Sequence, residues 1–132
     1  MQYNPDFLGV YACDDIPEVM HFPCSIIVNT DKRDEPGNHW VALYLLKEEC
    51  LYFDSFGVSV LEASLLSYLK RYYKKVLFNK ICIQPIESTL CGFYCISFVQ
   101  NVSSAISFNN FLLKFDFVNL HKNDNTVLKL IK

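Results

Sequence analysis

The unbroken apolar stretches of this chain are short, and their length limits what the chain can fold into. The longest covers residues 40–46, seven residues in a row. A helix that crosses a membrane needs about 20 apolar residues, so no such segment is expected. Short apolar runs bounded by polar or turn residues are typical of buried strands. The sequence therefore predicts a globular protein built around buried strands, with no membrane contact.

The composition agrees with one packed domain. The chain has 132 residues, of which 52% are hydrophobic and 20% charged, with only 4 glycines and 5 prolines. These values exclude a disordered, collagen-like or low-complexity chain. We expect a single domain over residues 1–132, because a chain of this size can build a real core. The net charge of −2 weighs against a general nucleic-acid binder.

The N-terminal residues and the cysteines indicate a reducing compartment. The start, MQYNPDFLGV, has no basic segment followed by an apolar one, so we expect no secretory signal and an intracellular protein. The six cysteines are irregularly spaced, which favours reduced thiols over a disulfide framework. Only Cys91 and Cys95 form a close pair. Without a second cluster, a zinc site is not expected.

Apolar periodicity divides the chain into strands and helices. Residues 1–23, with three prolines, are expected to be irregular. Strands are expected over 24–28, 39–46, 50–53 and 76–83, helices over 61–76 and 91–105, and a short helical tail within 108–132. The strands at 39–46 and 50–53 flank a polar turn and form a hairpin. This order predicts an α+β fold with a largely antiparallel sheet.

Cys91 stands where a reactive cysteine is expected. It follows a polar loop that contains Pro85, and it opens the apolar helix expected over 91–105. A thiol is a good nucleophile only as the thiolate, which a helix N-terminus or a neighbouring imidazolium stabilises. Gly92 has no side chain, so a substrate or another backbone segment can approach closely behind the thiol.

The expected hairpin brings a histidine and a carboxylate together. His39 begins one strand and Asp54 follows the other, so a turn centred on Glu48 puts both at the same open end. A carboxylate in that place holds an imidazole in one tautomer and stabilises its cation. Gln84, seven residues before Cys91, is suited to donate its amide to an oxyanion.

Taken alone, each of these residues has an ordinary structural explanation. A cysteine at a helix start is usually buried packing, and a strand histidine is usually a satisfied sheet residue. Asp54, close to Ser55 and Gly57, also suits a turn. The combination and its order, His then Asp then Gln and Cys-Gly, favour nucleophilic catalysis by a cysteine.

Five stretches of the sequence resemble a known family of enzymes. They are FLGVY (7–11), CSIIVNT (24–30), GNHW (37–40), LYFDSFG (51–57) and QPIESTLCGFYCISF (84–98). In this order the chain resembles the adenovirus-type processing cysteine protease (adenain) family, which is related to the ubiquitin-like-protein-specific proteases. The seven-residue step from Gln84 to Cys91 resembles the adenovirus branch, whereas Asp54 stands where adenovirus enzymes usually carry Glu.

The resemblance implies a fold and a role for each matching position. The family fold is a circularly rearranged papain-like α+β fold, with the sheet packed on a central helix that begins at the nucleophile. The implied catalytic residues are Cys91 as nucleophile, His39 as general base, Asp54 as its orienting group and Gln84 as oxyanion donor. Trp40 and Gly92 are the implied substrate-binding residues, Trp40 because its indole would shield the catalytic groups.

The resemblance also implies substrates and activators. It indicates a cysteine endopeptidase that cleaves virion or capsid precursor proteins near Gly, from a DNA virus or a virus-like mobile element. Such an enzyme would act in the host nucleus or cytoplasm where virions assemble, or within the virion. No cofactor is required by the sequence, but family enzymes are activated by a short viral peptide and by DNA. We expect a monomer.

Four basic residues gather near the end of the helix expected over 61–76. They are Lys70, Arg71, Lys74 and Lys75. Complementation of the helix dipole on a solvated face is one explanation, and a DNA contact is the other.

Two other functions remain open at the level of sequence. A deconjugating isopeptidase for a ubiquitin-like modifier would share the catalytic residues but needs a wide docking surface, for which a short chain has little area. A non-enzymatic binding module would keep the fold without the chemistry, and the complete set of four residues argues against it.

Overall fold

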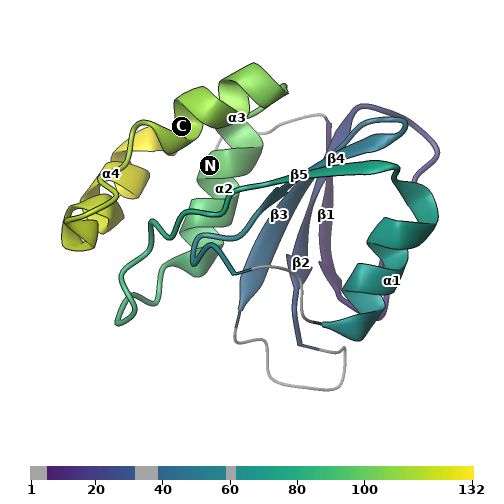
Figure 1. Cartoon of the computed structure of the whole chain (residues 1–132), viewed down its shortest axis with the longest axis horizontal. Helices are drawn as coiled ribbons and strands as arrows, with labels where there is room; N and C mark the ends of the chain where they lie inside the picture. The colour runs from purple at the N-terminus through teal and green to yellow at the C-terminus, as the bar shows by residue number, and fades with distance from the viewer. Residues whose placement is uncertain (1–5, 32–38, 59–61) are drawn as a thin grey trace.

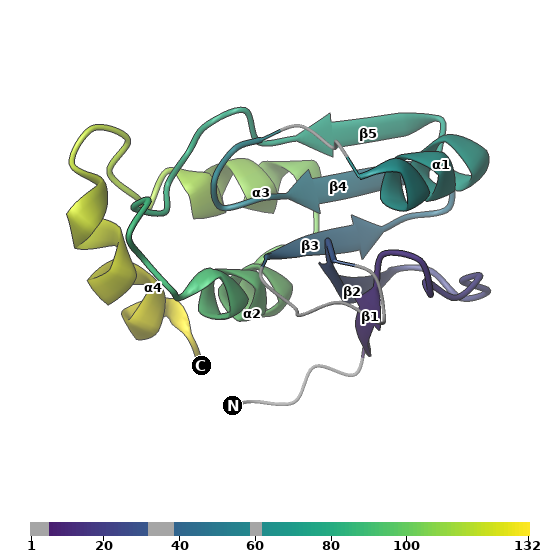
Figure 2. The same cartoon turned by 90° about the horizontal axis from the view of Figure 1, so that it is seen from below.

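A five-stranded sheet forms the centre of the computed structural model, which describes residues 6–31, 39–58 and 62–132. The strands lie in chain order across the sheet (Figure 2). They are β1 (Phe7–Ala12), β2 (Cys24–Asn29), β3 (Trp40–Leu45), β4 (Glu49–Phe53) and β5 (Lys75–Phe78). The structure is thus of the mixed α+β class that the sequence predicts.

The expectation of a largely antiparallel sheet is wrong, because the sheet is mixed. The pairs β2–β3 and β3–β4 are antiparallel, but β1–β2 and β4–β5 are parallel. Helix α1 (Ala63–Tyr72) joins β4 to β5, and a crossover of this kind returns the chain in the same direction. The connection from β1 to β2 likewise leaves the two strands parallel.

Strand β1 was not expected, since residues 1–23 were predicted to be irregular. Its residues alternate between half-buried and exposed. It lies at an edge of the sheet, and an edge strand carries a weaker apolar signal than a central one. The prolines on either side of it obscure that signal further.

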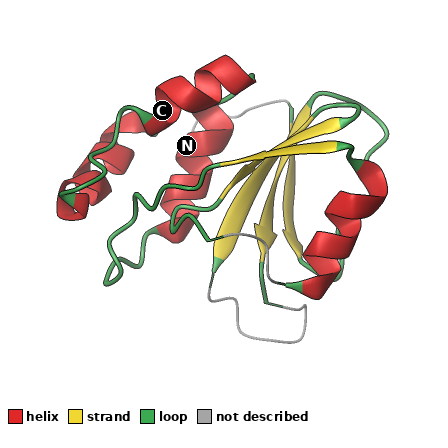
Figure 3. Cartoon of the chain, viewed as in Figure 1, coloured by secondary structure: helices red, strands yellow, loops and turns green. Residues whose placement is uncertain are grey.

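Helices cover both faces of the sheet (Figures 1 and 3). Helix α1 lies on one face, and helices α2 (Cys91–Asn101) and α3 (Ala105–Leu112) pack on the other. A short 3₁₀ turn, η1 (Leu120–Lys122), leads into α4 (Asn123–Leu130), which packs beside α2. The central strands are therefore buried on both faces, which explains their nearly continuous apolar runs.

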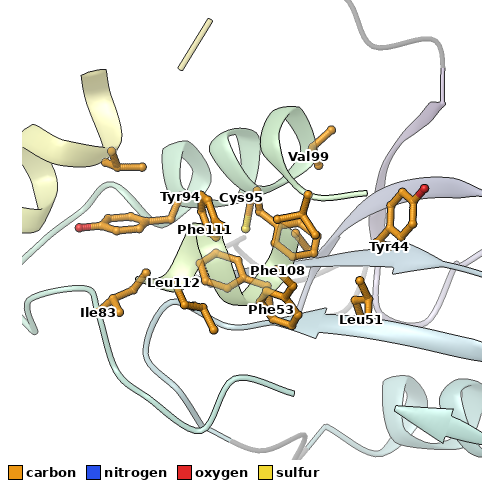
Figure 4. Close-up of a cluster of buried hydrophobic side chains, with 14 of the residues drawn as sticks. Tyr44, Leu51, Phe53, Ile83, Tyr94, Cys95, Val99, Phe108, Phe111 and Leu112 are labelled. Carbon is orange, nitrogen blue, oxygen red and sulfur yellow. The ribbon is translucent and has the colours of Figure 1, made fainter. Parts of the chain in front are cut away.

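The three central strands, β2, β3 and β4, send alternate side chains into two separate cores. Toward α2 and α3, Phe53 stacks on Phe98 with the ring centroids 5.2 Å apart. Phe53 also meets Phe111 edge to face (Figure 4). Toward α1, strand residues such as Leu43 pack with Leu65 and others. Both layers hold the central hairpin β3–β4 rigidly, and the candidate site lies at its open end.

Three elements are shorter than the periodicity predicts. The helix expected over 91–105 ends at Asn101, because Val102 adopts an extended backbone conformation, and Ser104 caps a separate helix, α3, from Ala105. Helix α1 ends at Tyr72 rather than at residue 76, and residue 61 lies outside the described residues. Strand β5 ends at Phe78 rather than at residue 83. The chain leaves the sheet there because Asn79 turns inward to hydrogen-bond the backbone of Asp54. In the described part of the chain, no helix is long and apolar enough to cross a membrane.

Candidate active site

The β3–β4 hairpin places His39 against Asp54. Strand β3 begins just after His39 and β4 ends just before Asp54, with Ala42 paired to Phe53. The His39 Nε2 atom lies 3.0 Å from Asp54 Oδ1. This hydrogen bond is the one that the hairpin geometry predicts, and it holds the imidazole at the open end of the sheet. Of the GNHW stretch, Gly37 and Asn38 lie outside the described residues.

The Asp54 carboxylate is itself fixed by its neighbours. Asp54 is 4% exposed, and its Oδ1 also accepts a hydrogen bond from the Phe56 N–H at 2.9 Å. The Asn79 side chain hydrogen-bonds both backbone groups of Asp54. It accepts from the Asp54 N–H at 2.9 Å and donates to the Asp54 carbonyl at 2.6 Å. The Phe56 ring lies against the imidazole of His39, with the centroids 5.2 Å apart. The orientation of the histidine is thus determined from both sides.

Cys91 is the first residue of α2 and faces the same histidine. The His39 side chain and the backbone N–H groups of Trp40 and Gly92 act as hydrogen-bond partners that lower the pKa of the Cys91 thiol. Because His39 uses Nε2 for Asp54, Nδ1 is left for the thiol. Burial raises the pKa of the Cys91 thiol, but these donors outweigh it, so the net shift is downward.

The pKa of His39 shifts in the opposite direction to that of Cys91. Burial disfavours the charged ring, yet the hydrogen bonds and charges of Asp54 and Cys91 outweigh burial and raise the pKa of His39 to about 9. A lowered thiol pKa beside a raised imidazole pKa favours a thiolate–imidazolium pair at neutral pH. This is the charge state that a cysteine nucleophile needs.

The other cysteines do not share this environment. All six cysteines fall within the described residues and are free thiols. Burial raises the pKa of Cys24 to about 11 and that of Cys95, one turn after Cys91, further still. The pKa of the Cys82 thiol is raised as well. Only Cys91 among the six has a lowered pKa, so its environment, and not cysteine content, marks the site.

Gln84 lines the same cavity as His39 and Asp54, and its side chain hydrogen-bonds Ser55 and Ser88. Its side chain is 1% exposed, and its Oε1 accepts a short hydrogen bond from the Ser55 hydroxyl. Its Nε2 donates to the carbonyl and to the hydroxyl of Ser88, at 3.1 Å each. Both acceptors belong to one residue, so a single N–H can serve them as a three-centre bond and leave the second N–H for a ligand.

Trp40 and Gly92 border the thiol in different ways. Trp40 is half-buried and packs against the core between the sheet and helices α2 and α3. Its backbone N–H is one of the groups that lower the pKa of Cys91. A Cβ built on Gly92 would meet no atom within 4 Å, so its surface is open. The roles of Trp40 and Gly92 in substrate binding stay a prediction.

A cavity of about 880 Å³ opens beside the site. His39, Asp54 and Gln84 line it, together with the highly exposed apolar side chains of Ile86 and Val118. A space of this size accommodates a peptide segment, and its walls are mostly apolar with a few polar groups. No group of three or more metal-binding side chains occurs among the residues that the structure describes.

Several residues that organise the site were not predicted. Asn79, Ser88 and Asp124 carry no motif of their own, and Asp124 lies 36 residues from Ser88, its hydrogen-bond partner. The only available signal was the polar character of the loop before Cys91.

The basic cluster lies away from this site. Lys70 and Arg71 are in the last turn of α1, and Lys74 pairs with Glu48 at 3.3 Å.

Comparisons with known proteins identify the fold. No family model and no curated protein matches the chain. The crystal structure of the pS273R protease of African swine fever virus (ASFV) matches with a TM-score of 0.53 and 21% identity, over 84% of this chain and 45% of that one. Its selenomethionine form matches with a TM-score of 0.50 and 22% identity, over 84% and 46%. This chain, which spans less than half the length of those proteins, therefore has the fold of a viral protease.

Proposed function

We propose that this protein is a cysteine endopeptidase in which Cys91 is the nucleophile. The observation that carries the proposal is the Cys91–His39–Asp54 arrangement, with a lowered thiol pKa beside a raised imidazole pKa. Shared fold alone does not determine chemistry, so the argument rests on the site. A buried histidine with no catalytic task needs neither a thiol partner nor a carboxylate fixed on both sides.

The reaction would proceed by acyl transfer. The Cys91 thiolate attacks the scissile carbonyl, and the carbonyl electrons move onto oxygen. The Cys91 N–H and the Gln84 amide stabilise that oxyanion. The His39 imidazolium gives its proton to the leaving amine as the C–N bond breaks, and the neutral ring then takes a proton from the water that hydrolyses the thioester. Asp54 keeps the imidazole oriented throughout.

We further propose that the substrates are virion precursor proteins, cleaved near Gly. Support comes from the sequence resemblance to adenain-type enzymes and from the likeness in fold to a viral protease. The circular rearrangement of the papain fold and membership of the adenain family are part of this proposal. The open surface at Gly92 and the half-buried Trp40 would border a narrow groove that favours small substrate residues.

A cleavage assay with a Cys91→Ala variant tests the proposal. The substrates are internally quenched peptides with Gly at and beside the scissile bond, and fluorogenic conjugates of ubiquitin-like modifiers. We expect the wild type to cleave the peptides and the variant to fall to background, a loss of at least about 10⁴-fold. Cys24→Ala, which removes a thiol with a raised pKa from the core on the α1 side of the sheet, should retain activity. Cleavage by Cys91→Ala would refute the assignment, and cleavage of modifier conjugates alone would indicate an isopeptidase.

Activation by a viral peptide or by DNA belongs to the same proposal. No cofactor is required for the chemistry described, and the proposed enzyme acts as a monomer. The DNA contact would involve Lys70, Arg71, Lys74 and Lys75, of which Lys74 also pairs with Glu48. Binding of a short DNA duplex that weakens steeply with salt, and weakens further when Lys70 and Arg71 are neutralised, would support a DNA contact. No binding at low salt would refute it.

A further inference from the structure

The first residues of helix α4 are tied to the loop that leads into Cys91. The buried Asn123 donates from Nδ2 to the carbonyl of Ile83 at 2.7 Å, directly before Gln84. Asp124 accepts from the hydroxyl of Ser88 at 2.9 Å. The N-terminal end of α4 therefore hydrogen-bonds the loop on both sides of Gln84, although α4 and this loop are far apart in the sequence (Figure 2).

The Asp124 carboxylate binds residues placed symmetrically around Cys91. One partner is the Ser88 hydroxyl, three residues before Cys91, and the other is the Tyr94 hydroxyl, three residues after it, each at 2.9 Å to the same Oδ1 atom. Tyr94 is fully buried, and burial together with its bond to Asp124 raises the pKa of its hydroxyl. The carboxylate thus joins the loop to the first turn of α2.

The hydrogen bonds of Ser88 have only one consistent direction. A carboxylate only accepts, so the single O–H of Ser88 points to Asp124. The two lone pairs of the hydroxyl then accept from Gln84 Nε2 at 3.1 Å and from the Leu90 N–H at 3.2 Å. Every hydrogen-bonding position of this hydroxyl is filled. On the other side, Ser55 donates to Gln84 Oε1, which requires the amide nitrogen to lie toward Ser88.

We propose that Asp124, acting through Ser88, is a positioning residue that orients the Gln84 amide for oxyanion stabilisation. The proposal rests on the proposed function, because it presumes that Gln84 is the oxyanion donor. Without the carboxylate, the Ser88 O–H would be free to rotate toward another acceptor. Gln84 Nε2 would then lose the lone pair that holds it, while the Cys91–His39 pair, which has no bond to this network, would keep its charge state.

Two reactions of the same sulfur separate this role from a general structural one. Acylation of Cys91 by p-nitrophenyl acetate passes through a tetrahedral oxyanion, whereas alkylation by iodoacetamide forms no oxyanion and depends on the thiolate. The nitrophenolate burst measures the first rate, and mass spectrometry of the Cys91 peptide measures the second, with a Cys91→Ala variant as the blank. The full chain is used, and no natural substrate is needed.

We expect Asp124→Ala and Ser88→Ala to slow acylation about tenfold each, with the alkylation rate unchanged. The double variant should lose no more than Ser88→Ala, because Asp124 acts through that hydroxyl. Asp124→Asn keeps an acceptor for both hydroxyls and should recover most of the rate. Gln84→Ala removes the proposed oxyanion donor itself and should slow acylation about 10²-fold or more. Asp116→Asn, a carboxylate of the same region that caps Val118 and Asn119 instead, should change neither rate.

Each outcome decides between the two proposals. If Gln84→Ala slows acylation but Asp124→Ala and Ser88→Ala do not, the positioning role is refuted and the proposed function stands. If Asp124→Ala slows acylation and alkylation equally and Asp124→Asn does not recover the ratio, Asp124 is only structural and the role is again refuted. If Gln84→Ala leaves acylation unchanged, Gln84 is not the oxyanion donor and the positioning proposal fails with it. Alkylation of wild-type Cys91 no faster than that of an ordinary thiol would refute the proposed function itself.

Discussion

His39 and Asp54 lie at the open end of the β3–β4 hairpin, where backbone register places them side by side with 3.0 Å between Nε2 and Oδ1, whereas the loop that carries Gln84 belongs to no strand. The hairpin is buried between two cores. The loop is held by side chains, through Ser55, Ser88 and the start of α4. The comparison shows that a sheet positions residues that are close in sequence, whereas a loop needs partners recruited from distant parts of the chain.

The largest effect on the hairpin side is expected from His39→Ala. Without the imidazolium, the thiol of Cys91 should return toward its ordinary pKa and be only a few per cent ionised at pH 7, so its alkylation by iodoacetamide should slow about 10- to 100-fold. Mass spectrometry of the Cys91 peptide over a pH series measures this. His21→Ala, an exposed histidine outside the site, is the control. An unchanged alkylation rate in His39→Ala would show that the loop and the helix N-terminus activate the thiol without the hairpin.

The pH dependence of peptide cleavage by the wild type should reflect the Cys91–His39 pair. Peptide cleavage should fall at high pH as His39 loses its proton around pH 9, since the leaving amine then lacks its acid. On the acid side, cleavage should fall only below the lowered pKa of Cys91, as the thiolate takes up a proton. A bell-shaped profile of kcat/KM would support the pair, and its two limbs belong to the pair as a whole. A rate that climbs steadily past pH 10 would contradict it.

Asn79→Ala should have the next largest effect, on stability. The side chain is 3% exposed and satisfies both the N–H and the carbonyl of Asp54. Its loss leaves buried backbone groups unpaired, so the free energy of unfolding should fall by about 1–3 kcal/mol. Denaturant unfolding measures this change, with Asn110→Ala, an exposed asparagine of α3, as the matched variant. If the two variants unfold alike, the sheet alone is enough to hold Asp54.

Glu48→Gln should have the smallest effect. This change breaks the ion pair with Lys74 at the closed end of the hairpin, where the two side chains are 61% and 80% exposed. Exposed pairs of this kind contribute little, so the free energy of unfolding should change by less than about 0.5 kcal/mol. Peptide cleavage should stay at the wild-type rate. A large loss of cleavage would mean that the hairpin transmits strain from its far end to His39 and Asp54.

Much of the site was predictable because it depends on local geometry. A hairpin with a short polar turn predicts that His39 and Asp54 meet, and the apolar pattern from residue 91 onward predicts a helix N-terminus at Cys91. Both arrangements are present. The catalytic roles of these residues stay a prediction until the assays above are done.

The errors in the predicted fold have physical causes of the same kind. Strand β1 and the parallel pairing of β4 with β5 depend on which segments meet across the sheet, and apolar periodicity carries no record of that. Strand β5 ends early because Asn79 finds partners on Asp54, 25 residues away.

Hydrophobic period and turn spacing were enough to predict the short buried strands, the helix that starts at Cys91 and the hairpin that joins His39 to Asp54. The mixed sheet, the hydrogen bonds of Asn79 to Asp54 and the attachment of Asp124 to the loop before Cys91 could be seen only in the folded protein. Single hydrogen bonds between distant polar side chains leave no periodic signal in a sequence. Those of Asp124 depend on the packing of α4 beside α2, which places their partners within 3 Å.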